Sequence, residues 1–347
     1  MLSEKRGHRW WGAKAATLVV ATVTSLSCSG IPELPAMIDG GWQGHGLTAV
    51  RCRLPSVVAV SFDEEVRLIN ARIDPSRQIV ESRWEDGALE LVVDQELSPG
   101  TEYWIDALVE DTAGNRSSLL VSVYGLNTDL PAVLINEFVC EASGNHGDWV
   151  ELLIVEDGNL GGMTLYEGTP QDWDSRKVLP PVGVHAGDRV IVHFKPQGTA
   201  DEIDEISDPS AGGGRNTHPE AFDFWVDGGD GIPNTTGGLV LTEAPEGEIV
   251  DAVLYTTKRY EAADDLRGFG LAGQLELFET VSAAGAWQVA GSIVVPDDGV
   301  DPETSTSTRS INREPGAPDT DAAADWYVGP TSSASPGVEN TFERYLP

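Results

Sequence analysis

Two glutamates in consecutive apolar segments are the first residues of this sequence that could do chemistry. Glu137 lies within VLINEFV (residues 133–139), and Glu151 lies within DWVELLIVED (residues 148–157). A pair of carboxylates can act as general acid and general base where a cleft raises the pKa of one of them. No feature of the two segments indicates a cleft, so we expect both glutamates to be architectural.

An architectural glutamate needs a partner for its charge. We expect one of the two to bind the amides of a turn, or a basic residue near the end of the sequence such as Arg309 or Arg313. Metal ligation together with Asp148 or His146 is the first alternative. Paired catalytic acids are the second.

Acidic loops elsewhere offer the oxygen ligands that calcium prefers. DFWVDGGDG (223–231) places Asp223, Asp227 and Asp230 around a glycine turn, and these three residues are the candidate calcium ligands. The other acid clusters are DEIDEISD (201–208) and DTDAAAD (319–325). None of these loops fits the D-x-[DN]-x-[DN]-G pattern, so acidic loops that are merely solvated are the alternative.

The common catalytic motifs are absent from the sequence. There is no G-x-S-x-G elbow, no H-E-x-x-H, no P-loop and no C-x-x-C. The six histidines are scattered, with no pair at i, i+2 or i, i+4; His185 and His193, which bracket one strand, are expected to be ordinary sheet histidines. We therefore predict that the protein is not an enzyme and that it needs no cofactor.

The charge balance excludes one large class of partner. The chain of 347 residues has a net charge of −34, and without residues 1–27 it keeps 18 basic against 55 acidic residues, a net charge of −37. Such a surface repels phosphate backbones, so we expect no nucleic-acid binding. It suits exposure outside the cytoplasm and is compatible with divalent cations.

The elements that must position these residues are short strands. Residues 47–128 contain segments in which apolar and polar residues alternate, as in half-buried strands. These segments are VVAVSF (57–62), ALELVVD (88–94), EYWIDALVED (102–111) and SLLVSVYG (118–125), with turn clusters at 98–100 and 111–115. Several short alternating strands in one region are typical of a β-sandwich.

The same region resembles the bacterial Ig-like domains related to fibronectin type III modules. The resembled pattern, L-x-P-x-T-x-Y followed by a D-x-x-G-N turn, is matched by Leu97, Pro99, Thr101, Tyr103, Asp111, Gly114 and Asn115. In such a corner the tyrosine ring fills the core and its hydroxyl returns to a backbone group. The resemblance implies a spacer or binding module, and no catalytic residue is carried over.

Residues 129–341 form the second predicted domain. Its strand-like segments are 133–139, 148–157, MTLYEG (163–168), RVIVHF (189–194) and GLVLTEAPEGEIVDAVLY (238–255), the last of which reads as two strands joined by a turn. Alternation places Trp149, Glu151 and Leu153 on one side of their strand and Val150, Leu152 and Ile154 on the other.

The order of these segments resembles the lamin tail domain, an Ig-like β-sandwich that bacteria use in secreted proteins. The matching positions are Ile135, Asn136 and Glu137; Asp148, Trp149, Val150, Glu151 and Leu152; Gly162 and Leu165; Leu239, Leu241, Gly247, Val250, Asp251 and Val253; and finally Arg309 or Arg313, Asp325, Trp326, Ser335, Pro336, Gly337 and Asn340. The resemblance implies that Glu137 and Glu151 lie on adjacent strands. We predict an all-β chain of two Ig-like β-sandwich domains in tandem.

Two long insertions interrupt the second domain. They cover residues 198–235 and 258–300. The second is expected to hold a short helix around GLAGQLELFETVSAAG (270–285), where apolar residues recur at helical spacing between glycines. The first carries the aromatic run AFDFW, which contains Phe222, Phe224 and Trp225. We expect these aromatics to be core, with an exposed partner site as the alternative.

The N-terminal residues 1–27 read as an export signal. Four basic residues precede the apolar run AATLVVATVTSLS (15–27), which is followed by Cys28. This resembles a bacterial lipoprotein signal, although Ser25 stands where the usual motif has an aliphatic residue. The resemblance implies lipidation of Cys28, and residues 28–46 read as a tether. An ordinary secretory signal is the alternative.

Cys52 and Cys140 are the two other cysteines. In an oxidising compartment they could form a disulfide, and two buried free thiols are the alternative.

Taken together, these features predict an exported lipoprotein, anchored to a membrane of the bacterial cell envelope on the periplasmic face or the outer surface. Its expected role is non-catalytic binding or scaffolding with a protein or envelope partner. The alternatives are a calcium-dependent adhesin and an accessory subunit of a secreted nuclease or phosphatase. A metal-dependent hydrolase built on the acidic loops is the least favoured reading.

Overall fold

The computed structural model describes residues 46–144 and 146–347. The predicted signal segment 1–27, the lipidation site Cys28 and all of the tether 28–46 except Gly46 lie outside the described residues. Within the described part of the chain, no helix combines the length and the apolar character needed to cross a membrane.

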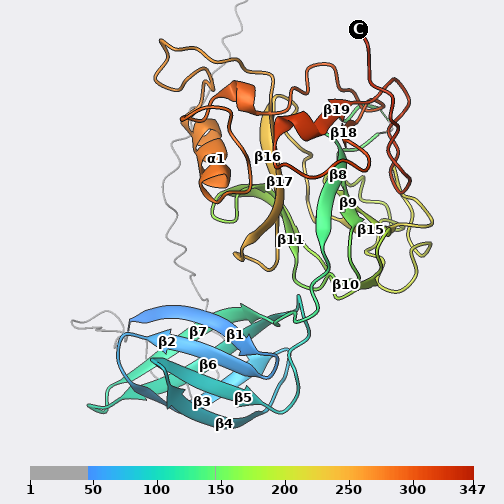
Figure 1. The fold of residues 1–347 in the computed structure, drawn as a ribbon. Helices are drawn as coiled ribbons and strands as arrows, with labels where there is room; N and C mark the ends of the chain where they lie inside the picture. Colours follow the sequence, from blue (N-terminus) through green and yellow to red (C-terminus); the bar gives the residue numbers. More distant parts are fainter. Residues whose placement is uncertain (1–45, 145) are drawn as a thin grey trace, which may run out of the picture. The chain divides into compact units, whose positions relative to one another are not determined.

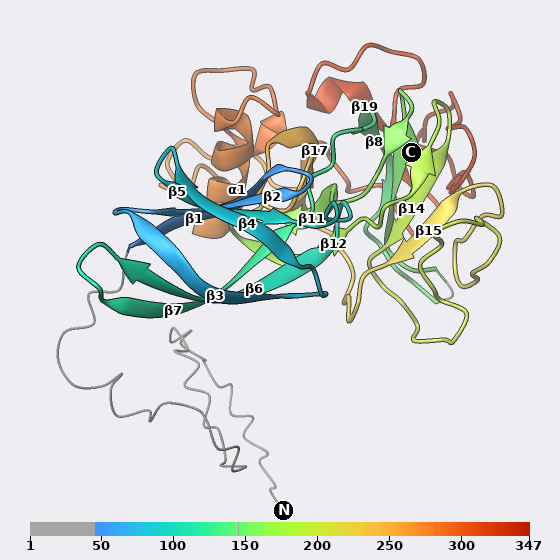
Figure 2. The ribbon, with the colours of Figure 1, turned by 90° about the horizontal axis from the view of Figure 1, so that it is seen from below.

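The first seven strands form two antiparallel sheets that share one core (Figures 1 and 2). They are β1 (Leu47–Leu54), β2 (Val57–Phe62), β3 (Val66–Asp74), β4 (Ile79–Glu85), β5 (Ala88–Val93), β6 (Glu102–Asp111) and β7 (Arg116–Tyr124). One sheet has the order β1-β2-β5-β4 and the other the order β3-β6-β7. Alternate residues of β6 are buried between the sheets, which is the pattern predicted from the sequence.

The tyrosine corner expected from the sequence is present at the start of β6. Tyr103 is buried, and its hydroxyl accepts a hydrogen bond from the Ser98 amide at 3.1 Å. At the other end of the strand, Asp111 Oδ1 accepts from the amides of Ala113 and Asn115 at 2.8 and 2.7 Å. These local bonds explain why that tyrosine and that aspartate occur at their spacing.

The remaining strands form the second domain. They are β8 (Val133–Val139), β9 (Trp149–Ile154), β10 (Gly158–Asn159), β11 (Thr164–Gly168), β12 (Trp173–Val178), β13 (Gly183–Val184), β14 (Arg189–His193), β15 (Phe222–Trp225), β16 (Thr236–Thr242), β17 (Ile249–Thr256), β18 (Ile311–Arg313) and β19 (Trp326–Val328). A six-stranded sheet has the order β15-β14-β9-β8-β18-β19, and a four-stranded sheet has the order β12-β11-β16-β17. Strands β10 and β13 pair separately.

The two large sheets enclose one apolar core and are linked by a cation near each edge. Val150, Leu152 and Ile154 of β9 point into this core, as their alternation predicted. Lys177 of β12 donates to the Trp225 carbonyl of β15 at 2.7 Å, and Arg313 of β18 pairs with a carboxylate on β17. The charged ends of both side chains therefore bind one sheet to the other.

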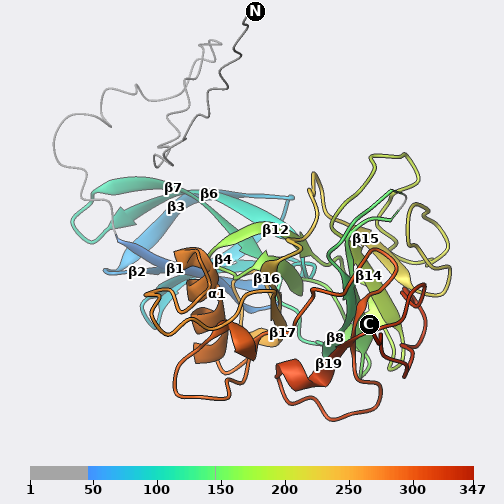
Figure 3. The ribbon, with the colours of Figure 1, turned by 90° about the horizontal axis from the view of Figure 1, so that it is seen from above.

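The predicted short helix is confirmed. Helix α1 (Ala272–Ala283) lies beside β16 and buries Phe278 and Val281 against the core (Figure 3). Two short 3-10 turns, Pro296–Asp298 and Ala323–Asp325, complete the helical content of the described residues. The prediction of an all-β, sandwich-like chain with long insertions and one short helix is therefore confirmed.

Candidate functional site

The two glutamates of the opening motifs lie directly opposite each other. Glu137 of β8 pairs with Glu151 of β9 in the antiparallel ladder, next to a bulge between Ile135 and Glu137. Neither glutamate is exposed to solvent. Because opposite residues share a face, both carboxylates lie on the outer face of the six-stranded sheet, away from the apolar core.

Both carboxylates accept hydrogen bonds from a segment almost two hundred residues later, which we call the closing segment (residues 335–340). Glu137 Oε1 accepts from the Ser335 amide at 2.9 Å, and Oε2 accepts from the Ser335 hydroxyl at 2.8 Å. Glu151 Oε2 accepts from the Gly337 amide at 2.6 Å. The expectation that one of these acids binds the amides of a turn is confirmed, and the structure shows that both do.

The basic partner differs from the two arginines that the sequence suggested. Arg189 Nε lies 3.3 Å from Glu151 Oε1, and Asn136 Nδ2 donates to the same oxygen at 2.7 Å. Asn136 also exchanges side-chain hydrogen bonds with Asn340 of the closing segment. The segment is thus held by two carboxylates and one amide pair.

Burial dominates the electrostatics of this pair. It raises the pKa of Glu137 to about 7, against the lowering effect of hydrogen bonds from Ser310 and Ser335. It raises the pKa of Glu151 to about 8, and the charge of Glu137 adds to the rise. Two buried carboxyl groups so close together do not both ionise easily, because their negative charges repel each other.

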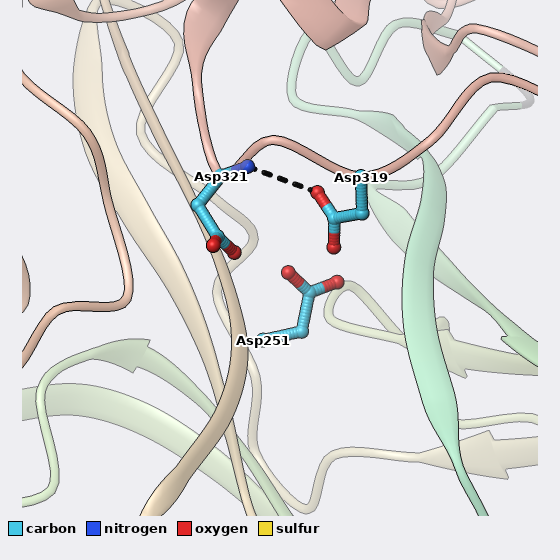
Figure 4. A group of neighbouring side chains, drawn as sticks. All are labelled: Asp251, Asp319 and Asp321. Atoms are coloured by element: carbon cyan, nitrogen blue, oxygen red, sulfur yellow. Dashed lines mark hydrogen bonds between the residues drawn. The ribbon is translucent and has the colours of Figure 1, made fainter.

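Three aspartates converge at the edge where the two sheets meet (Figure 4). Asp251, Asp319 and Asp321 have carboxylate oxygens within 4.8 Å of one another, and they are the one such group of three among the described residues. Arg313 already supplies a positive charge here, because it donates to Asp251 Oδ2 at 2.7 Å and to Asp319 Oδ1 at 2.5 Å. A resident guanidinium explains the convergence without a metal ion.

The candidate calcium ligands Asp223, Asp227 and Asp230 lie in β15 and in the loop that follows it. Within the described chain these three do not form a group of converging ligand atoms. Asp223 lies in β15 and is buried, where its carboxylate contacts His193 Nε2 at 2.6 Å and accepts from the His218 amide at 3.2 Å. Asp227, by contrast, is exposed in the turn that follows β15. Their close spacing in the sequence therefore does not bring the three carboxylates together, because strand β15 buries Asp223.

The acids of the cluster 201–208 serve backbone amides. Glu202 accepts from the amides of Gln197, Gly198 and Thr199 at 2.6–3.1 Å. Asp204 accepts from the Trp225 amide, and Glu205 accepts from the amides of Gly212 and Asp223. The carboxylates of the acidic insertion thus hold it together through hydrogen bonds to its own backbone amides.

Several other sequence candidates have structural roles. Phe224 lies in the apolar core and the half-buried Phe222 packs against it, so the expectation that these aromatics are core is confirmed for the two phenylalanines, whereas Trp225 is buried outside that core. His193 is a buried sheet histidine, as expected, but its stacking on Trp225 with ring centroids 3.9 Å apart was not foreseen. Asp148 Oδ2 accepts from the Ile232 amide at 3.0 Å.

Both described cysteines, Cys52 and Cys140, are free thiols. The disulfide left open by the sequence is therefore not formed between them.

One buried acid escaped the sequence reasoning altogether. Glu167 of β11 is buried, and no hydrogen bond or ion pair joins its carboxylate to another described residue. Burial, together with the charges of Asp174 and Asp172, raises its pKa to about 7. The alternation of MTLYEG contains the signal, because Glu167 falls on the same face as the core residue Leu165.

Comparison with known proteins places the second domain in a sequence family. The family described as TP_1001_2nd, protein second domain, matches residues 131–328. An uncharacterized protein of Treponema pallidum (strain Nichols) is 28% identical over 160 residues, which cover 45% of this chain and 39% of the relative, well under two thirds of its length. The crystal structure of a DUF4876 family protein from Bacteroides thetaiotaomicron VPI-5482 aligns with 82% of this chain and 93% of its own, at 12% identity and a TM-score of 0.27. None of these names states an activity.

Proposed function

This chain belongs to the TP_1001_2nd family, and from that premise we propose that it is a non-catalytic binding or scaffolding module of a bacterial cell envelope. In this proposal residues 1–27 direct export and acyl chains on Cys28 anchor the protein to the membrane. The first seven strands are an Ig-like spacer, and the second domain is a lamin-tail-like sandwich whose insertions contact a protein or envelope partner.

The observation that carries the proposal is that the acidic residues at the positions matching the lamin tail pattern accept hydrogen bonds from other residues at matching positions. Glu137 and Glu151 accept the amides of Ser335 and Gly337. Likewise, Asp251 accepts from the Ile135 amide and from Arg313. The residues that resemble the lamin tail pattern therefore act as each other's structural partners, which favours a rigid scaffold over a reactive site.

Charge and burial favour the same conclusion. A catalytic carboxylate must reach its substrate, whereas Glu137, Glu151 and Asp251 are at most 1% exposed and are occupied by donors of the chain itself. A substrate would have to displace the closing segment before it could touch either glutamate.

An activity screen tests the non-catalytic part of the proposal. The full chain is incubated with phosphate esters and nucleic acids, with magnesium, manganese, calcium or zinc, beside Glu167→Gln as the matched variant. Glu167 is chosen because its buried carboxylate has no partner in the described chain. We expect the two proteins to give the same background. Turnover that Glu167→Gln abolishes would refute the proposal.

Fractionation and cross-linking test the anchor and the partner. The full chain and Cys28→Ala are expressed with the same tag, cross-linked in cells and separated into membrane and soluble fractions. We expect the wild-type chain in the membrane fraction with a specific cross-linked envelope protein, and Cys28→Ala in the soluble fraction. Equal membrane association of both chains would exclude the acyl anchor, and capture of a hydrolase would favour the accessory-subunit alternative.

A further inference from the structure

The closing segment is attached to the sheet mainly through side chains rather than through a strand ladder. Its amides at Ser335 and Gly337 both donate to carboxylates, at 2.9 and 2.6 Å. Asn340 Nδ2 adds bonds to the carbonyls of Asn136 and Arg313, each at 3.1 Å. The attachment therefore depends on the state of two buried acids.

The groups that face these acids are unbalanced in charge. Arg189 of β14 lies 3.3 Å from Glu151, and it is the one cation that forms an ion pair with either glutamate in the described chain. The Tyr327 hydroxyl of β19 also interacts electrostatically with Glu137. His218 packs against Gly337, so close that a Cβ on Gly337 would lie 2.3 Å from the His218 Cβ. When both glutamates are ionised, two buried anions lie near one arginine that is itself only partly buried.

We propose that the closing segment is a pH-sensitive latch: it stays bound to the six-stranded sheet while one of Glu137 and Glu151 holds a proton, and it loosens as both become ionised. The proposal goes beyond the scaffolding function and does not depend on it. Like charges directly opposite each other on neighbouring strands are destabilising, and burial strengthens the repulsion.

Opening of the latch is coupled to release of a proton. In the closed state burial raises the pKa of the two carboxyls to about 7 and about 8. In the open state water reaches them, and their pKa falls towards the ordinary value for glutamate, about 4.3. Since opening releases a proton, rising pH favours it. The closed state is therefore strongest below about pH 5 and weakens as the pH rises through the closed-state values near 7 and 8.

Hydrogen exchange of the closing segment tests the latch. The full chain is exchanged at several values between about pH 5.5 and pH 8.5, and the protection of peptides that cover residues 335–340 is corrected for the intrinsic rate of exchange. We expect protection to fall by about tenfold or more across this range, because a pKa difference of one unit corresponds to a tenfold change in an equilibrium constant.

Matched variants decide whether the glutamates are responsible. Glu151→Gln removes one titrating group but keeps an amide oxygen that accepts from Gly337, so protection should fall less steeply with pH than in the wild-type chain, because only Glu137 still releases a proton on opening. Glu137→Gln is the second variant, for the case in which the first does not fold. Glu167→Gln alters a buried acid on the other sheet, and it should keep the full pH dependence. A wild-type chain without pH dependence, or glutamine variants that retain all of it, would overturn the latch.

Discussion

Arg313 and Asp251 bind the two sheets of the second domain to each other. The Arg313 Nη2 atom on β18 lies 2.7 Å from Asp251 Oδ2 on β17, and both side chains are almost fully buried. Arg313 Nε also donates to the Ile135 carbonyl of β8, and its guanidinium lies over the Trp326 ring. One side chain thus joins three strands of the six-stranded sheet to the edge of the four-stranded sheet.

Replacement of Arg313 by methionine should destabilise the second domain strongly. The change leaves the Asp251 carboxylate buried without a cation, which typically costs about 3–5 kcal/mol. Urea denaturation gives the free energy of unfolding. Arg344→Met is the control, because Arg344 is about half exposed and pairs with Glu314 at 2.6 Å, so its loss should cost less than about 1 kcal/mol. Similar costs for both variants would contradict the bridging role of Arg313.

Removal of the Tyr103 hydroxyl should destabilise the domain formed by strands β1 to β7. Tyr103→Phe leaves the Ser98 amide and the Arg77 guanidinium without this acceptor, at a cost of about 1–2 kcal/mol. The protection of β6 amides against hydrogen exchange is the measurement. Tyr260→Phe serves as the control, because Tyr260 is 46% exposed and should tolerate the change. An unchanged β6 in Tyr103→Phe would show that the corner hydroxyl is dispensable.

A methyl group at Gly337 should disrupt the closing segment. Gly337 has φ +81° and leaves no room for a Cβ beside His218, so alanine adds a clash to the cost of a left-handed backbone, about 1–2 kcal/mol. Gly316→Ala is the matched control, because its φ is +68° but no atom lies within 4 Å of the added carbon. We expect Gly337→Ala to lower the melting temperature clearly more than Gly316→Ala. Equal shifts would mean that the contact with His218 is unimportant.

Glu167→Gln should stabilise the protein at alkaline pH. Burial raises the pKa of this carboxyl to about 7, above its value in the unfolded chain, so the folded state loses stability as the pH rises from about 4.3 to about 7. Glutamine carries no charge to bury and removes this loss. The variant should exceed the wild type by about 1–3 kcal/mol at pH 8, and the gain should disappear near pH 4. A constant difference at both pH values would contradict the assignment of the raised pKa.

The strands of this protein follow from local patterns. Segments 57–62, 102–111 and 133–139 are strands with the predicted bounds. In 102–111 the alternation of the sequence also shows which face is buried, because one face of that strand meets the core. The Tyr103 corner was predictable for the same reason, since its hydrogen-bond partner lies only five residues away in the chain.

Other elements carry no comparable local signal. Strand β12 is exposed or half-exposed throughout, and strands β18 and β19 have only three residues each. Strand β15 pairs in parallel with β14 after a long insertion, and this pairing buries Asp223 beside His193. The spacing of the aspartates along the chain favours a calcium loop at this place. Spacing does not reveal a strand such as β15, which forms only by pairing with a neighbour that is distant in sequence.

The sequence by itself determined the fold class, the faces of the main strands and the expectation that Glu137 and Glu151 are structural. Only the tertiary structure decided what they hold, because their partners Ser335 and Gly337 lie 198 and 186 residues away. Burial patterns are set by each residue and its near neighbours. Hydrogen-bond partners across such separations are set by strand order and register, which no local pattern encodes.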